Sequence, residues 1–189
     1  MIPRILIGAL LLMSCQGPRP DPRDEDRLIE ARGMLSSDPD RALAIADQLL
    51  ERYGSWREAR LLIADGSFAL YKDQRRENRE LLLQDAIASY EIASGLGAPD
   101  ASCLLSLAEA RLEARRWEGA IAAADEAAAL AASGDRETWI RARLVAASAS
   151  FRKFAAERER EIRTGTPDGT ASCPSPGGRP NSPRARSRA

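Results

Sequence analysis

Apolar residues recur along the middle of the chain at three- and four-residue steps, which is the spacing of one face of an α-helix. The clearest stripes lie in residues 39–53, 81–94 and 117–132, and no segment alternates with a period of two. Alanine and leucine supply most of the apolar positions, and both are strong helix formers. The pattern therefore predicts an all-α domain over about residues 26–163.

Turn and cap residues divide this domain into seven expected helices. Asp38 followed by Pro39 predicts a helix start, because aspartate caps free N–H groups and proline is tolerated at the first helical position. Gly54 and Gly134 mark expected breaks. The charged stretch 72–80 has no apolar residue, so it is either a solvated loop or a lengthening of the helices beside it. The expected helices cover about 26–35, 39–53, 55–71, 81–94, 101–114, 117–132 and 136–163.

One apolar pattern occurs twice, 34 residues apart. The residues Ala86, Ile87, Ala93 and Leu96 have counterparts in Ala120, Ile121, Ala127 and Leu130. This offset between helix pairs is the tetratricopeptide period. The clearest unit, residues 101–132, resembles that family through Leu104, Leu107, Ala108, Trp117 and Ala120, and departs from its pattern at Arg111 and Ala124.

The resemblance implies a short α-solenoid of antiparallel helix pairs with atypical first and last units. It also implies a concave groove lined by the first helix of each pair, which would bind an extended or helical segment of another protein. The groove residues that it implies are Ile63, Ser67, Leu70, Leu105, Glu109 and Leu112. The alternative fold is an Ala-rich helical bundle whose period comes from composition alone.

The N-terminal segment has a different pattern. Arg4 precedes an uncharged apolar run over residues 5–13, which is shorter than the roughly 20 residues of a spanning helix and suits a signal peptide. Residues 11–15, LLMSC, resemble the lipobox of bacterial lipoproteins. The resemblance implies cleavage before Cys15 and a covalent lipid on that residue. The alternatives are a fortuitous cysteine after a secretory signal and an uncleaved N-terminal anchor.

The expected order is a signal peptide (1–14), a Pro-rich tether (15–25), the helical domain (26–163) and a basic disordered tail (164–189). Gln16 stands where aspartate retains lipoproteins in the inner membrane of some bacteria. We therefore expect an outer-membrane address that faces the periplasm. The composition of the tail also fits a truncated or frameshifted longer protein.

Composition narrows the chemistry of the chain. Histidine, the commonest general base and metal ligand, does not occur, and the 28 basic and 28 acidic residues cancel, so no basic field for nucleic acid is expected. Cys103 lies in an expected helix and Cys173 in the tail; a buried thiol at Cys103 is favoured, and a disulfide between the two stays open. We expect no catalytic site, metal or small-molecule substrate, and no cofactor except the lipid on Cys15.

These patterns predict a lipid-anchored protein of the bacterial cell envelope whose helical domain binds another envelope protein or peptide segment without catalysis. Two other functions remain: an enzyme accessory or peptidoglycan- or sugar-binding protein, and a structural tether without a specific groove. The tryptophans Trp56, Trp117 and Trp139 lie far apart in the sequence. We expect them to pack between helices rather than to form a sugar site.

Overall fold

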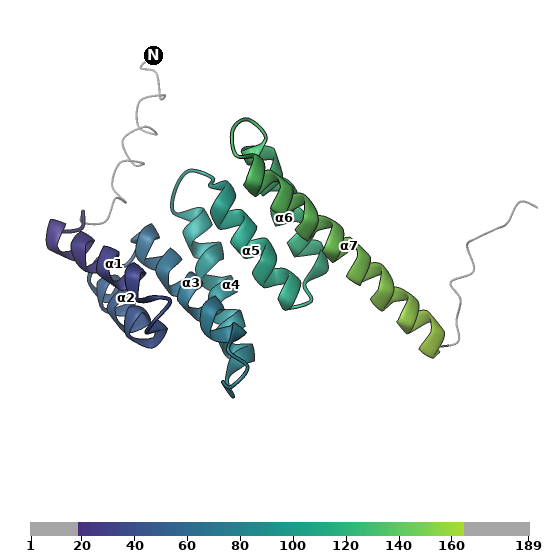
Figure 1. Ribbon diagram of the computed structural model, residues 1–189, viewed down its shortest axis with the longest axis horizontal. Coiled ribbons are helices and arrows are strands. Elements are labelled where there is room, and N and C mark those ends of the chain that lie inside the picture. The colour runs from purple at the N-terminus through teal and green to yellow at the C-terminus, as the bar shows by residue number, and fades with distance from the viewer. Residues whose placement is uncertain (1–18, 165–189) are drawn as a thin grey trace, which may run out of the picture. The chain divides into compact units, whose positions relative to one another are not determined.

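The computed structural model describes residues 19–164 and contains seven α-helices and no β-strand over that range (Figure 1). Cys15, the expected signal peptide and residues 165–189 lie outside the described residues. The helices are α1 (Pro22–Met34), α2 (Pro39–Tyr53), α3 (Arg57–Lys72), α4 (Arg79–Gly95), α5 (Ala101–Glu113), α6 (Trp117–Ala131) and α7 (Arg136–Thr164). The all-α prediction is confirmed for this part of the chain.

The described residues belong to two units that divide within α7, after Lys153. In the first unit, α1 to α6 lie beside one another in chain order, each packed against the next (Figure 1). Short connections make neighbouring helices antiparallel, so the expected packing of consecutive helices in pairs is confirmed. The described part of the second unit is the end of α7, where Arg158 pairs with Glu161 and Arg163 with Glu159 along the helix.

Local sequence determines both ends of α2. The Asp38 carboxylate accepts a hydrogen bond of 3.1 Å from the backbone N–H of Arg41, and Pro39 is the first helical residue. Gly54 ends the helix with φ at 65°, a left-handed conformation that costs glycine little. Both predicted boundaries of this helix are confirmed.

The first helix, α1, begins at Pro22, about four residues before the expected start. Asp21 caps this helix, because its carboxylate accepts a hydrogen bond of 2.9 Å from the backbone N–H of Arg23. One turn later, Asp24 is buried and accepts hydrogen bonds from the Tyr53 hydroxyl at 2.7 Å and from Arg52 at 2.5 Å. The cap and these contacts with the end of α2 make the last residues of the expected tether helical.

The environment of Asp24 predicts a dependence of stability on pH. The hydrogen bond from Tyr53, assisted by Arg52, lowers the pKa of Asp24 below its ordinary value of 3.8 although burial opposes the shift. The carboxylate therefore stabilises the fold above that value, and the contribution is lost as pH falls through the lower folded-state pKa. We expect Asp24→Asn to reduce the free energy of unfolding near neutral pH. We also expect this variant to lose less of its free energy of unfolding on acidification than the wild type does. Urea denaturation at neutral and at acidic pH measures both effects.

Asp26→Asn is the matched control, because Asp26 is an exposed carboxylate on the same helix. This variant should lose stability on acidification as the wild type does. If Asp24→Asn does so too, the buried carboxylate contributes nothing to the pH dependence.

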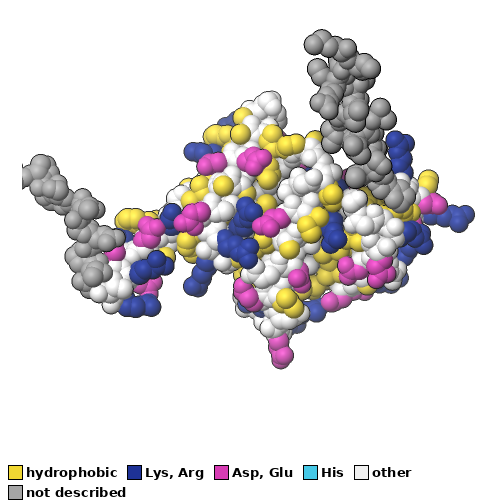
Figure 2. All heavy atoms as spheres, turned by 180° about the vertical axis from the view of Figure 1, so that it is seen from behind, with side chains coloured by type: hydrophobic (Ala, Val, Ile, Leu, Met, Phe, Trp, Pro, Cys, Tyr) yellow, Lys and Arg dark blue, Asp and Glu magenta, His cyan; other side chains and the backbone are white. Residues whose placement is uncertain are grey.

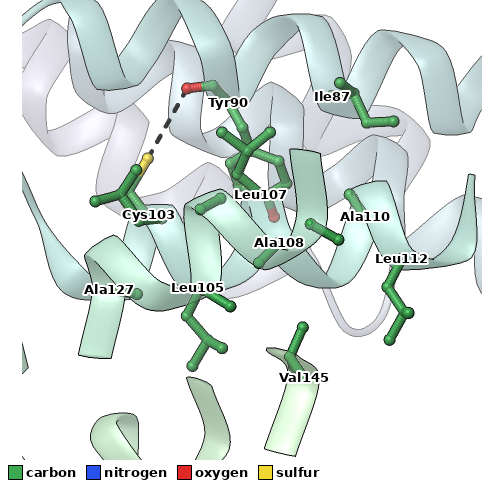
Figure 3. Close-up of a cluster of buried hydrophobic side chains, with 14 of the residues drawn as sticks. Ile87, Tyr90, Cys103, Leu105, Leu107, Ala108, Ala110, Leu112, Ala127 and Val145 are labelled. Atoms are coloured by element: carbon green, nitrogen blue, oxygen red, sulfur yellow. Dashed lines mark hydrogen bonds between the residues drawn. The ribbon is translucent and has the colours of Figure 1, made fainter. Parts of the chain in front are cut away.

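Two buried clusters stabilise the first unit. The smaller joins α1, α2 and α3 around the fully buried Leu49 and Leu62. The larger joins α3 to α7 and includes Ile87, Tyr90 and Leu107 (Figure 3). The buried residues of α6 are all alanines: Ala120, Ala123, Ala124, Ala127, Ala128 and Ala131. Small side chains at the contact let helices lie close together.

Two residues, Gly66 and Arg111, have a visible role in helix packing. A Cβ atom at Gly66 would lie 2.7 Å from Cδ2 of Leu43, so glycine allows the close approach of α3 to α2. Arg111, which departs from the pattern, donates hydrogen bonds to the carbonyl of Gly119 at 3.0 Å and to Glu91 at 2.9 Å. Its guanidinium therefore connects α5 with both α6 and α4.

Cys103 is a free, buried cysteine in α5. Its Sγ lies 3.9 Å from the backbone oxygen of Tyr90, as the dashed line in Figure 3 marks. Burial raises the pKa of the Cys103 thiol, which disfavours the reactive thiolate. The expectation of a buried thiol is confirmed, whereas Cys173 lies outside the described residues.

Candidate functional site

The six residues expected to line a groove do not form one exposed surface. Four of them are buried: Ser67, Leu70, Leu105 and Leu112. Ile63 is half-buried against the smaller cluster, and Glu109 is half-buried on α5. Figure 3 shows Leu105 in the same buried cluster as Val145 of α7. This part of α5 is therefore a packing surface for α7.

Ion pairs also join α7 to the preceding helices. Arg141 contacts Glu109 of α5 at 2.7 Å, and Arg143 contacts Asp125 of α6 at 3.1 Å. Both arginines and Asp125 are more than half exposed and Glu109 is 28 % exposed, so each pair contributes little to stability. Arg141 does neutralise the carboxylate of Glu109, which was expected to face a partner.

A pocket of about 350 Å³ brings together two of the expected residues, Glu109 and Leu112. Phe68, Tyr71 and Lys72 of α3, Arg79 of α4, and Glu109, Leu112 and Glu113 of α5 line this α3–α5 pocket. Its volume lies at the lower end of the range for ligand pockets. It combines apolar, aromatic and charged groups of both signs in one small space.

Aromatic rings and cations order the α3 side of the pocket. The rings of Phe68 and Tyr71 stack with their centroids 6.0 Å apart. Lys72 Nζ lies 4.2 Å from the centre of the Phe68 ring, and the Arg79 guanidinium carbon lies 4.9 Å from that of Tyr71. Both are cation–π distances. The ring stacking and the two cation–π contacts therefore stabilise one arrangement of these four side chains.

Tyr71 also links the two sides of the pocket. Its hydroxyl donates a hydrogen bond of 3.4 Å to Glu113 of α5, and Nε of Arg79 donates to its backbone oxygen at 2.8 Å. Burial, reinforced by the charge of Glu113, raises the pKa of the Tyr71 hydroxyl. The hydroxyl is therefore a neutral hydrogen-bonding group at physiological pH.

The stretch 72–80 explains how the cations reach this pocket. Of the two interpretations left open, each is partly right: α3 runs to Lys72, α4 begins at Arg79, and a loop joins them. In that loop, the Asp73 carboxylate accepts a hydrogen bond from the N–H of Arg75 at 3.0 Å. The lengthened helices place a cation on each side of the loop.

Sequence reasoning missed five pocket residues: Phe68, Tyr71, Lys72, Arg79 and Glu113. A usable signal was present, because two aromatic residues three positions apart and a cation one residue later share one side at the end of a helix. Arg79 had no such signal, since its place depends on how α4 packs against α3.

A wider hollow of about 910 Å³ lies between the α2–α3 and α4–α5 turns. Arg57 and Asp100 form an ion pair of 3.2 Å among its lining residues. The walls come mainly from turns, and the two facing charges neutralise each other. The α3–α5 pocket, where side chains from three helices converge, is the stronger candidate for a binding site.

The three tryptophans do not share a site within the described residues. Trp56 and Trp117 are half-buried against the two clusters, as expected. Trp139 is 41 % exposed, so its expected packing between helices is not observed. Trp56 lines the wide hollow, and Trp139 lines a small depression beside the turn that precedes α7.

Acidic and basic side chains are interspersed on the face of the molecule drawn in Figure 2. Over residues 19–164, no cluster of three side chains of the His, Cys, Asp or Glu type could bind a metal ion. In the same range, none of the helices has the length and apolar character needed to span a membrane.

Comparisons with known proteins identify no relative of this chain. No family model matches it, nor does any curated protein sequence or solved structure. A functional proposal therefore rests on the α3–α5 pocket and on the two resemblances within the sequence.

Proposed function

We propose that this chain is a non-catalytic adaptor of the bacterial cell envelope, anchored by a lipid on Cys15. Its tetratricopeptide-like domain binds a segment of another envelope protein in the α3–α5 pocket. The observation that carries the proposal is this pocket, which Leu112 and two aromatic rings line together with cations from α3 and α4 and carboxylates from α5. The lipobox-like sequence supports the envelope address, at the periplasmic face of the outer membrane.

A peptide segment fits the chemistry of the pocket. One apolar side chain of the partner would contact Leu112 and Phe68, and its complete burial contributes about 1.5–3 kcal/mol. The exposed cation of Lys72 and the carboxylate of Glu113 would then orient the charges that flank this anchor. The small volume suits a single anchoring side chain, with the remaining contacts made by the helices around it.

The sugar-binding alternative is less well supported by the geometry. A sugar ring needs an open aromatic face, whereas Lys72 covers one face of Phe68 and Arg79 covers one face of Tyr71. Trp56, Trp117 and Trp139 supply no shared platform. A tether without a groove would leave the convergent side chains of the pocket without a role.

Photo-crosslinking in intact cells tests the proposal. A photoreactive amino acid in place of the exposed Lys72 should yield one dominant adduct with a protein, identified by mass spectrometry, because this position borders the anchor site. Ala122 is the control position, since it is exposed on α6 and outside the pocket.

The same adducts from both positions would contradict a specific pocket. Glycan or lipid adducts alone from position 72 would favour the sugar-binding or tether function instead.

A further inference from the structure

In the first unit, α7 carries apolar residues on two opposite faces. The buried face consists of Ala142, Val145, Ala146 and Ala149. The exposed face, called the outer face below, consists of Ile140, Leu144, Ala147 and Phe151. At about 100° per residue, the centres of these two sets lie roughly 180° apart around the helix. One face packs on the domain, and the other faces solvent.

The outer face is both strongly apolar and well exposed. Ile140 is 41 % exposed, Leu144 62 % and Phe151 72 %. Along the chain, its four residues follow steps of four, three and four, which is the spacing of a seam that packs against a second helix. Large apolar side chains that lie exposed next to one another mark an interaction site. The geometry of this site fits a helix.

Charge distinguishes between the occupants of such a seam. Arg136 lies one turn before Ile140 on the same side of α7. Arg143, which also contacts Asp125 of α6, flanks the seam with its side chain 57 % exposed. From Arg136 to Lys153, α7 has a single acidic residue, Glu137. Two α7 helices packed together would bring cations close to cations, which is unfavourable. A helix with acidic flanks would instead pair with them.

We infer that the outer face of α7 binds an amphipathic helix of a partner protein, with apolar residues at the seam and Asp or Glu beside it. This surface is separate from the α3–α5 pocket and does not depend on the function proposed for that pocket. It would give the chain a second contact with an assembly.

Binding of designed peptides to the purified full chain tests this inference. The probe is a labelled synthetic helix with Leu at heptad positions a and d and Glu at e and g, and the comparison peptide has Lys in place of Glu. In fluorescence anisotropy, we expect the Glu peptide to bind at least about tenfold more tightly, with an affinity that falls as salt is added. Leu144→Glu should weaken that binding by about tenfold or more, since it places a charge in the apolar seam.

Leu81→Glu is the matched control, because Leu81 of α4 is 61 % exposed and Leu144 is 62 % exposed. This variant should bind the Glu peptide with the affinity of the wild type. Arg136→Glu should reduce the ratio between the affinities for the Glu peptide and the Lys peptide. Three results would overturn the inference: no binding of the Glu peptide, equal affinities for the two peptides, or unchanged binding by Leu144→Glu. A wild-type dimer that Leu144→Glu makes monomeric in sedimentation would also overturn it, since the occupant would then be a second copy.

Discussion

Cys15→Ala is expected to abolish metabolic incorporation of labelled acyl chains and to release the chain from membranes. The expectation rests on the lipobox-like residues 11–15, in which Cys15 is the acceptor of the lipid. The thermal unfolding transition should not change, because the substitution lies outside the helical domain. The readouts are label incorporation in cells, partition between membrane and soluble fractions, and circular dichroism of the purified domain.

The size of this effect follows from the energetics of lipid anchoring. Each buried CH₂ group contributes about 0.8 kcal/mol to membrane binding, and one acyl chain alone gives only reversible attachment. Several acyl chains on one cysteine are therefore what holds the protein stably on the membrane. Loss of the lipid should therefore shift nearly all of the protein to the soluble fraction.

Cys173→Ala is the control, because it removes a different cysteine of the same chain and should leave labelling unchanged. Retention of label in Cys15→Ala would show that the acceptor lies elsewhere. If the lipid is present, the start of α1 at Pro22 keeps the domain near the membrane, since the seven residue steps from Cys15 span at most about 25 Å.

Tyr90→Ala is expected to lower the free energy of unfolding by about 3–5 kcal/mol, the usual cost of deleting a large buried ring. Tyr90 is 2 % exposed in α4, and its hydroxyl donates a hydrogen bond of 2.6 Å to Asp65 of α3. Its backbone oxygen lies 3.9 Å from the Cys103 sulfur of α5. The residue therefore contacts both neighbouring helices, and the loss is a large fraction of the roughly 5–15 kcal/mol that stabilises a domain.

Tyr90→Phe separates the ring from the hydroxyl. It keeps the packing of the ring and removes the hydroxyl with its hydrogen bond to Asp65, so we expect the free energy of unfolding to fall by about 1–2 kcal/mol in urea denaturation. A Tyr90→Ala variant no less stable than Tyr90→Phe would show that the ring is not central to the larger cluster.

Helix type and most helix ends could be predicted from the sequence, because short-range effects determine them. Asp38, Pro39 and Gly54 act through their own backbone geometry and capping bonds. The predicted start of α1 lies about four residues after the observed one, because residues 22–25 are polar and give no periodic signal. Their helix depends on the Asp21 cap and on the contact of Asp24 with the end of α2, which joins residues nearly thirty positions apart.

The candidate site was predicted only in part. The repeat resemblance pointed to α3 and α5, and two of its residues, Glu109 and Leu112, do line the pocket. Ser67, Leu70 and Leu105 are buried instead. A helical period tells which residues share a face, but not whether another helix covers that face, as α7 covers Leu105.

The sequence by itself determined that this chain forms a series of short helices, where most of them begin and end, and that Cys15 is the residue to test for a lipid. Hydrophobic period, capping and turn residues act locally, and a short motif needs no fold. Only the tertiary structure decided which apolar faces are buried, how Phe68, Tyr71, Lys72 and Arg79 converge, and that α7 keeps an exposed apolar seam. These features depend on contacts between helices distant in the chain, and the pattern along one helix does not encode them.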